Sequence, residues 1–242
     1  MIKHPVFIDY QPEPNVVPEA ALLSCSQGLV IAAHQLAERA EGWDLECAAV
    51  CVTDNAELPA FDDTTYRVVA ASSRINNAVA SPDGSRIIIK TQIARPQPSY
   101  TLNRSQHGSG FVFYAPDPAT LRGFQIPDLD IGLRQWLEGL DPDQICGIWL
   151  DCPEAEAAES GLELDMLATA RAAFTGEIWL SGGAHNFKHI QNLVREGNCD
   201  ALVLTLKQFG KLGGDAVVTE MNPPERIPMT QLAETPSACS TA

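Results

Sequence analysis

Two aspartates follow short apolar runs, and carboxylates at such positions can transfer protons. Asp9 follows Val6-Phe7-Ile8, and Asp151 follows Ile148-Trp149-Leu150. If both runs are strands of one parallel sheet, both side chains lie at its carboxyl edge, the catalytic face of a parallel barrel. Such a pair can act as general acid and general base when one carboxyl is protonated and the other ionised. An acid at a strand end can also be a helix cap or an ion-pair partner, and this alternative remains open.

A pair of glycines marks a second candidate site. The segment Trp179-Leu180-Ser181-Gly182-Gly183-Ala184 passes from an apolar run through the glycines into a predicted helix. Glycine lets the backbone approach a ligand closely, and N–H groups at the start of a helix attract anions. We therefore expect Ser181, Gly182 and Gly183 to bind an anion such as phosphate.

Positive charge is concentrated in the middle of an acidic chain. The net charge is −15, yet residues 66–122 carry seven basic and two acidic side chains. Arg95 and Arg104 lie in this stretch and are expected to contribute to anion binding, and Lys207 could do the same beside a glycine-rich segment. The alternatives are a flexible basic loop around Arg95 and Arg104 and an ordinary surface loop at Lys207.

Histidine and cysteine offer weaker candidates for chemistry. His185 and His189 are four residues apart, as metal ligands on one helix face can be, but no third ligand is near. A solvated or capping pair is therefore expected, and no metal. Cys152 follows Asp151 and could be exposed at the mouth of a barrel, but no nearby histidine would activate it as a nucleophile. The seven cysteines are scattered without a CxxC pair, which is typical of a reducing compartment.

The second half of the chain alternates short apolar runs with helical patterns. This alternation is typical of βα units around a parallel sheet. The predicted strands are 145–151, 177–180 and 201–204, and the predicted helices are 131–137, 162–174 and 187–195, the last ending at Gly197.

The first half is less regular. It predicts strands at 4–9, 46–53, 66–70, 86–90 and 110–114, a long helix over 20–40, and a functional or mobile Pro/Ser-rich loop over 94–110. The predicted fold class is α/β, a (βα)8 TIM-barrel-like domain over residues 1–221 with an irregular, helix-poor middle section. Residues 222–242 are expected to form a flexible, Pro-rich tail.

Residues 145–209 resemble the last three βα units of the histidine-biosynthesis barrels, ProFAR isomerase and the cyclase subunit of imidazole glycerol phosphate synthase. The matching stretches are 148–151, 164–167, 180–184 and 196–203. The resemblance implies that the Gly182-Gly183 turn and the loop after residue 204 hold a substrate phosphate, and that Asp9 is catalytic. It extends to relatives linked to pterin-type one-carbon cofactor pathways. The loop 151–159 holds four acids, which would repel a bisphosphorylated substrate.

These features predict a biosynthetic enzyme of isomerase or lyase type that acts by acid–base chemistry, without a cofactor, on a small phosphorylated or anionic metabolite. The alternatives are a role in pterin-type cofactor biosynthesis and a catalytically inactive barrel that serves as a subunit. The net charge disfavours nucleic-acid binding, and no apolar run is long enough to span a membrane. A cytoplasmic location is expected, and a homo-oligomer or a protein partner is compatible with the sequence.

Overall fold

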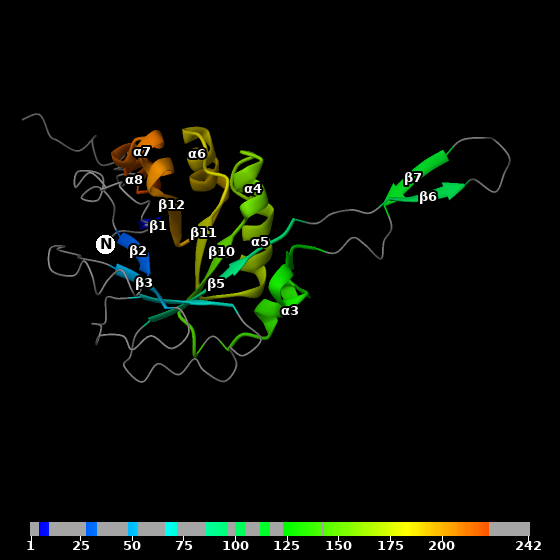
Figure 1. The fold of residues 1–242 in the computed structure, drawn as a ribbon, viewed down its shortest axis with the longest axis horizontal. Coiled ribbons are helices and arrows are strands. Elements are labelled where there is room, and N and C mark those ends of the chain that lie inside the picture. Colours follow the sequence, from blue (N-terminus) through cyan, green and yellow to red (C-terminus); the bar gives the residue numbers. More distant parts are fainter. Residues whose placement is uncertain are drawn as a thin grey trace, which may run out of the picture.

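The computed structural model describes residues 5–9, 28–32, 48–52, 66–71, 86–95, 100–104, 112–116, 123–141 and 143–222 (Figure 1). For 31–32, 48–52, 100–104 and 112–116 it describes the backbone alone. The predicted tail therefore lies outside the described residues, apart from residue 222.

A curled parallel sheet forms the centre of the molecule. Its strands follow the order β1-β12-β11-β10-β5-β4-β3-β2, and β1 pairs in parallel with both β12 and β2, which closes the ring. The predicted α/β class is confirmed, and the curled parallel sheet is compatible with the predicted TIM-barrel-like fold. The strands are β1 (Val6–Asp9), β2 (Gly28–Ala32), β3 (Ala48–Val52), β4 (Tyr66–Ala70), β5 (Arg86–Gln92), β10 (Gly147–Asp151), β11 (Glu177–Ser181) and β12 (Ala201–Thr205).

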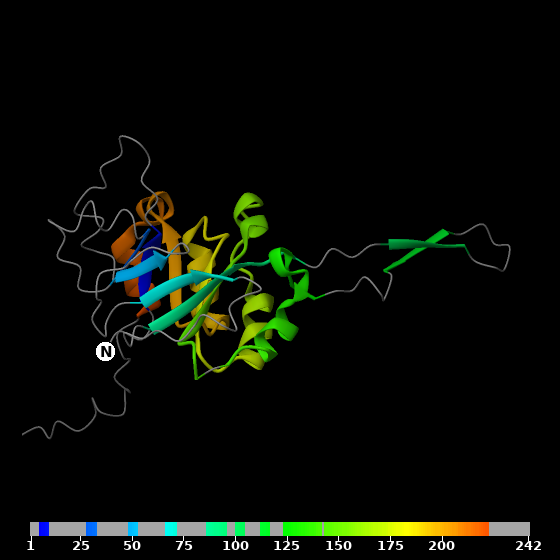
Figure 2. The same ribbon diagram turned by 60° about the horizontal axis from the view of Figure 1, so that its bottom comes forward.

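Helices alternate with strands in the second half of the chain, as the sequence predicts. Figure 2 shows these helices around the outer side of the sheet. None of the helices in the described residues is long and apolar enough to cross a membrane. They are α3 (Leu133–Glu138), α4 (Pro153–Ala157), α5 (Leu164–Ala173), α6 (Phe187–Glu196), α7 (Leu206–Leu212) and α8 (Gly214–Met221).

Two short antiparallel pairs accompany the main sheet. β6 (Tyr100–Arg104) pairs with β7 (Val112–Pro116) in a hairpin that stands apart from the ring in both views (Figures 1 and 2). β8 (Gln125–Ile126) pairs with β9 (Ile131–Gly132) across the 3-10 turn η3 (Pro127–Leu129). The predicted loop over 94–110 is thus wrong in part, because it contains β6.

Aromatic rings fill the interior of the ring of strands. Trp179 stacks on Phe7 with a centroid distance of 4.3 Å, and it meets the rings of Tyr66 and Trp149 at 4.9 and 6.5 Å. Successive side chains of a strand point to opposite faces, so these four occupy inner positions of β1, β4, β10 and β11. The other buried members of this inner cluster are Val30, Val68, Ile88, Ala201 and Val203.

The alternate residues of the same strands point outward, where their side chains pack against the inward faces of the helices. Ile8, Ile148 and Leu202 belong to this second cluster, together with Met166 from α5 and Leu193 from α6. The near-continuous apolar runs of the strands therefore arise because both faces of the sheet are covered.

Polar side chains close the end of the ring at which the strands begin. Glu177 accepts hydrogen bonds from Tyr66 Oη (3.4 Å) and Trp179 Nε1 (3.2 Å), and forms an ion pair with Arg86. The Arg86 guanidinium lies 4.3 Å from the centroid of the Tyr66 ring. Burial, followed by the charge of Glu177, raises the pKa of Tyr66. Residues at this end of a parallel barrel commonly serve stability.

Cys146, at the same end of the ring, is expected to react slowly with alkylating reagents because its thiol has a raised pKa. Burial first, and then the negative charge of Glu177, raise the pKa of this thiol to about 11 from 9.0. The thiolate is the reactive form, so at pH 8 we expect iodoacetamide to modify Cys146 about a hundredfold more slowly than in the urea-unfolded chain. Mass spectrometry of the Cys146 peptide measures both rates.

The pH dependence separates this effect from simple shielding of Cys146. With a raised pKa, the folded-state rate continues to rise between pH 9 and 10, whereas the unfolded-state rate levels off near the ordinary pKa of the thiol. A slow folded-state rate that levels off at the same pH as the unfolded one would contradict the prediction.

Two predicted elements differ from the structure. The predicted helix over 20–40 is wrong at 28–32, which form β2, and its remaining residues lie outside the described part of the chain. A Cβ atom at Gly28 would lie 2.4 Å from the Phe7 ring, so this strand fits only because position 28 has no side chain. The predicted loop at Lys207 is also wrong. It forms α7, whose first turn is fixed by a capping box between Thr205 and Gln208.

Candidate functional site

Five side chains meet inside the ring, near the end at which the strands finish. Consecutive members contact one another, and we call the set the mouth cluster: Asp9, Lys90, Trp149, Ser181 and Asp151. The members come from β1, β5, β10 and β11. The structure thus brings the two predicted aspartates into one series of contacts at the end where parallel barrels carry catalytic residues.

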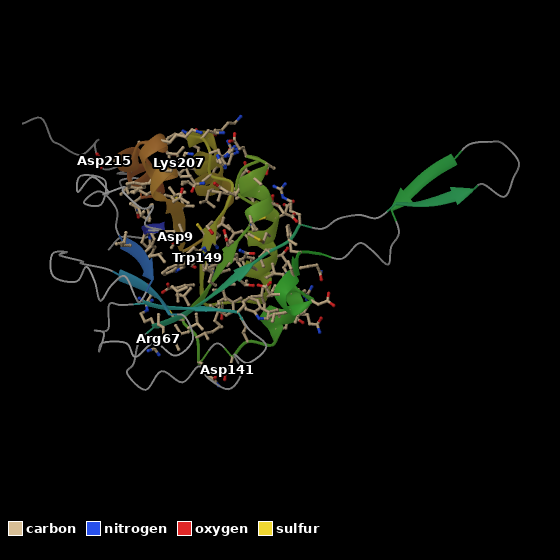
Figure 3. The ribbon with its side chains drawn as sticks, viewed as in Figure 1. Asp9, Arg67, Asp141, Trp149, Lys207 and Asp215 are labelled. Atoms are coloured by element: carbon tan, nitrogen blue, oxygen red, sulfur yellow. The ribbon has the colours of Figure 1, made fainter. Side chains whose placement is uncertain are left out.

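Lys90 connects Asp9 to Trp149 within the mouth cluster. Its Nζ lies 3.7 Å from Asp9 Oδ2 and 3.6 Å from the centroid of the Trp149 ring. Figure 3 labels Asp9 and Trp149 within the curled sheet. Because β1 and β5 are four places apart in a ring of eight strands, the ion pair spans the interior. The face of an indole ring attracts a cation, so Trp149 supports the ammonium group from one side.

Ser181 connects Trp149 to Asp151. Trp149 Nε1 donates to Ser181 Oγ at 2.7 Å, and Ser181 Oγ donates to Asp151 Oδ1 at 2.7 Å. An indole N–H can only donate, so the serine hydroxyl uses its own proton for the carboxylate. Asp151 is thereby held in one orientation at the carboxyl end of β10.

This arrangement is suited to proton transfer. Lys90 can donate hydrogen bonds to negative charge that develops on a substrate oxygen, and such stabilisation is a large contribution in many enzymes. Asp9 and Asp151 are the two ends of this series of contacts, and carboxylates can accept or return a proton. The sequence analysis identified both carboxylates and missed Lys90.

The Gly182-Gly183 turn follows β11, as predicted, with a backbone that requires glycine. The φ angles are +91° at Gly182 and +98° at Gly183. A Cβ atom at Gly183 would lie 2.2 Å from the carbonyl oxygen of Gly161, and one at Gly182 would lie 2.4 Å from that of Cys152. Two main-chain segments therefore pack directly against the turn.

A carboxylate of the chain itself occupies the predicted anion site at this turn. The backbone N–H of Gly183 donates to Glu156 Oε2 at 2.7 Å, and Gln208 Nε2 lies 2.8 Å from each Glu156 oxygen. His185 Nε2 lies 3.3 Å from Oε2, and its closer partner is the backbone carbonyl oxygen of Glu156 at 3.0 Å. We call the three groups around this carboxylate, from Gly183, Gln208 and His185, the anion cradle.

Gln208 can present only its amide nitrogen to Glu156. Its Oε1 accepts hydrogen bonds from the backbone N–H and the hydroxyl of Thr205, at 2.9 and 3.0 Å. A backbone N–H must donate, which settles the orientation of the amide. The cradle thus offers donors where an anion requires them.

No protein-family model matches the chain. The search of curated proteins also finds no match. The likeness of residues 145–209 to the histidine-biosynthesis barrels therefore remains a resemblance, and the geometry of the chain's own residues carries the argument.

Arg95 lies beside the strand ends, but its side chain is engaged by neighbouring loops. Its Nε donates to Glu163 at 2.6 Å, and its guanidinium also bonds Ser160. Its backbone N–H donates to Glu154 at 3.1 Å. These contacts tie the segment after β5 to the loops around α4.

The other two predicted cations do not meet the mouth cluster in the described contacts. Lys207 is exposed on α7, near the top of the view in Figure 3. Arg104 ends β6 in the separate hairpin, and its side chain lies outside what the structure describes.

The two histidines are not a pair on one helix. His185 precedes α6, while His189 lies in its first turn, where its backbone N–H donates to the capping side chain of Asn186 at 3.2 Å. His189 Nδ1 lies 2.9 Å from the carbonyl oxygen of Gly183. Within the described segments, no three His, Cys, Asp or Glu side chains are grouped to hold a metal ion.

Cys152 is buried rather than exposed at the mouth. Its exposed fraction is 0%, and burial raises the pKa of its thiol. A buried, protonated thiol is a weak nucleophile.

Proposed function

We propose that this chain is an enzyme of the (βα)8-barrel type that catalyses proton transfer, as an isomerase or lyase, on a small anionic metabolite. The ion pair between Lys90 and Asp9 supports this most directly. The side chains of Lys90 and Asp9 are 29% and 18% exposed, so both charges are partly withdrawn from water, at a desolvation cost that apolar side chains would not carry. An ion pair in this place therefore favours a role in chemistry.

The roles follow from the contacts. Lys90 binds an anionic oxygen of the substrate, and Asp9 exchanges a proton with an adjacent carbon or hydroxyl group. Asp151, oriented by Ser181, is the second acid–base group, at the other end of the series of contacts from Asp9. The resemblance to the histidine-biosynthesis barrels supports acid–base chemistry at Asp9, and a pterin-type biosynthetic role belongs to the same proposal.

A ligand screen followed by an exchange measurement tests the proposal. Thermal shift of the purified protein is measured with small carboxylates, sugar phosphates, nucleotides and pterins, since a ligand at a hundred times its Kd adds about 2.7 kcal/mol of stability. Solvent exchange of carbon-bound protons of the ligand found is then followed by NMR in D2O. We expect Lys90→Met and Asp9→Asn to slow this exchange at least about a hundredfold.

Lys188→Met is the matched control, because it removes one exposed lysine from α6, outside the mouth cluster. Its exchange rate should equal that of the wild type. Exchange that persists in both Lys90→Met and Asp9→Asn would exclude the mouth cluster as the catalytic site.

The occupied anion cradle favours a second candidate, a catalytically inactive barrel that serves as a subunit. In that case no metabolite stabilises the protein in the screen, and the purified chain co-purifies with a stoichiometric partner when isolated from its own cells.

A further inference from the structure

The carboxylate of Glu156 is held by the fold, although its side chain remains 37% exposed. Glu156 belongs to α4, which starts directly after β10. The residue between them, Cys152, is tied to the end of β11, because its backbone N–H donates to the carbonyl oxygen of Ser181 at 3.2 Å. Ala155, the preceding residue, is 0% exposed. A Cβ atom at Gly183 would lie 3.2 Å from that of Ala155, so α4 packs directly on the glycine turn.

Two donors of the cradle, the N–H of Gly183 and the side-chain amide of Gln208, need an anion as their partner. Gly183 is buried and the exposed fraction of Gln208 is 8%, so few of their N–H groups can turn to water instead. Leaving a buried donor without a partner costs about 1–3 kcal/mol. A carboxylate is planar and fits the donors of the glutamine amide through both of its oxygens.

A free anion would have to displace a carboxylate that is covalently part of the site. A tethered group acts at an effective concentration on the order of millimolar or higher. Glu156 would also repel the approaching negative charge, and Glu159, 3.6 Å from His185 Nδ1, adds to that repulsion.

We infer that Glu156 is a specificity-determining residue that occupies the anion cradle of Gly183, Gln208 and His185, so that the substrate carries no phosphoryl group bound at this turn. This inference rests on the proposed function and narrows its substrate class. The anionic group of the substrate is a carboxylate or an enolate-type oxygen that binds Lys90. The hydrogen bond from Gly183 to Glu156 then serves to join β11 to α4.

Inorganic phosphate is the probe that tests the inference. We expect Glu156→Ala to bind phosphate at least about tenfold more tightly than the wild type, measured by isothermal titration calorimetry and by the rise in melting temperature. Glu159→Ala is the matched control. It removes the same charge near His185 and leaves the cradle filled, so its affinity for phosphate should rise far less than that of Glu156→Ala.

A double variant connects the gained binding to the cradle. Glu156→Ala combined with Gln208→Leu should lose the phosphate binding that Glu156→Ala gains. Equal gains in Glu156→Ala and Glu159→Ala would mean that overall charge alone is responsible, and this would overturn the inference. Absence of any gain in a folded Glu156→Ala protein would do the same.

The wild type tests the inference even if Glu156→Ala does not fold. Saturable stabilisation of the wild type by phosphate that disappears in Gln208→Leu would show that the cradle accepts phosphate, and the inference would fail. None of these measurements depends on turnover. Failure of the cradle is therefore distinguishable from failure of the proton-transfer proposal, which depends on Lys90 and Asp9.

Discussion

Replacing Trp179 with alanine is expected to lower the free energy of unfolding by about 3–5 kcal/mol, the usual cost of deleting a large buried aromatic side chain. Trp179 is fully buried and contacts the rings of Phe7, Tyr66 and Trp149. Its removal would leave a cavity at the centre of the ring of strands, where the surrounding backbone is paired on both sides and cannot collapse. Urea unfolding followed by circular dichroism measures the change.

Two further variants help to interpret the stability loss in Trp179→Ala, one at the same position and one at an exposed control position. Trp179→Phe keeps an aromatic ring and loses the hydrogen bond from Nε1 to Glu177, so its cost should be clearly smaller. Val194→Ala shortens a side chain that is 38% exposed, and it should change the stability by no more than about 0.5 kcal/mol. A Trp179→Ala protein as stable as Val194→Ala would contradict the aromatic interior.

The strands and helices of the second half could be predicted because local pattern and tertiary environment agree there. Ile148 and Leu150 face the helices while Trp149 faces the interior, so the run is apolar throughout, as in a strand covered on both faces. The amphipathic segments between such runs form helices that can bury their apolar faces only on the outer side of the sheet.

β2 was missed because a five-residue run lies within a longer segment rich in helix-forming residues. Gly28-Leu-Val-Ile-Ala becomes a strand through contacts remote in sequence, including the packing of Gly28 on Phe7 and the pairing of β2 with both β1 and β3. Helix propensity is a weak preference that tertiary contacts override.

The candidate site was predictable only in part, for a related reason. Asp9, Asp151 and Ser181 stand at strand ends, where alternation and edge position indicate a mouth. Lys90 also follows the inner face of its strand, two residues after Ile88, and this alternation could have identified it. Its partner Asp9 comes from the opposite side of the ring, and nothing in the local sequence indicates that pairing.

Glu156 shows the limit of motif-based prediction most clearly. The glycine turn has the backbone expected for anion binding, with positive φ angles at both glycines and the Gly183 N–H bonded to a carboxylate. Whether the anion is a ligand or a side chain depends on where α4 places the carboxylate. That placement follows from the packing of Ala155 on Gly183, which a linear pattern does not contain.

Gly183→Ala is expected to destabilise the fold by about 3 kcal/mol or more, because it adds two costs at one position. The φ of +98° is unfavourable for any residue with a side chain, by about 1–2 kcal/mol. The new Cβ would also lie 2.2 Å from the carbonyl oxygen of Gly161, a main-chain atom that cannot rotate away. Crowding of this kind typically costs a further 1–3 kcal/mol or so. Thermal and urea unfolding measure the sum.

Two glycines elsewhere separate these costs. Gly213 has a φ of +76°, but a Cβ there would meet nothing closer than Ala216 at 4.0 Å, so Gly213→Ala reports the backbone cost alone. Gly147 has no positive φ, but a Cβ there would lie 2.5 Å from the carbonyl oxygen of Glu177, so Gly147→Ala reports the crowding alone. Gly183→Ala carries both costs, so it should destabilise the fold more than either Gly213→Ala or Gly147→Ala. If Gly183→Ala costs no more than Gly213→Ala, the segment containing Gly161 yields to the new methyl group. The turn then does not hold α4 and Glu156 as rigidly as the exclusion of phosphate requires.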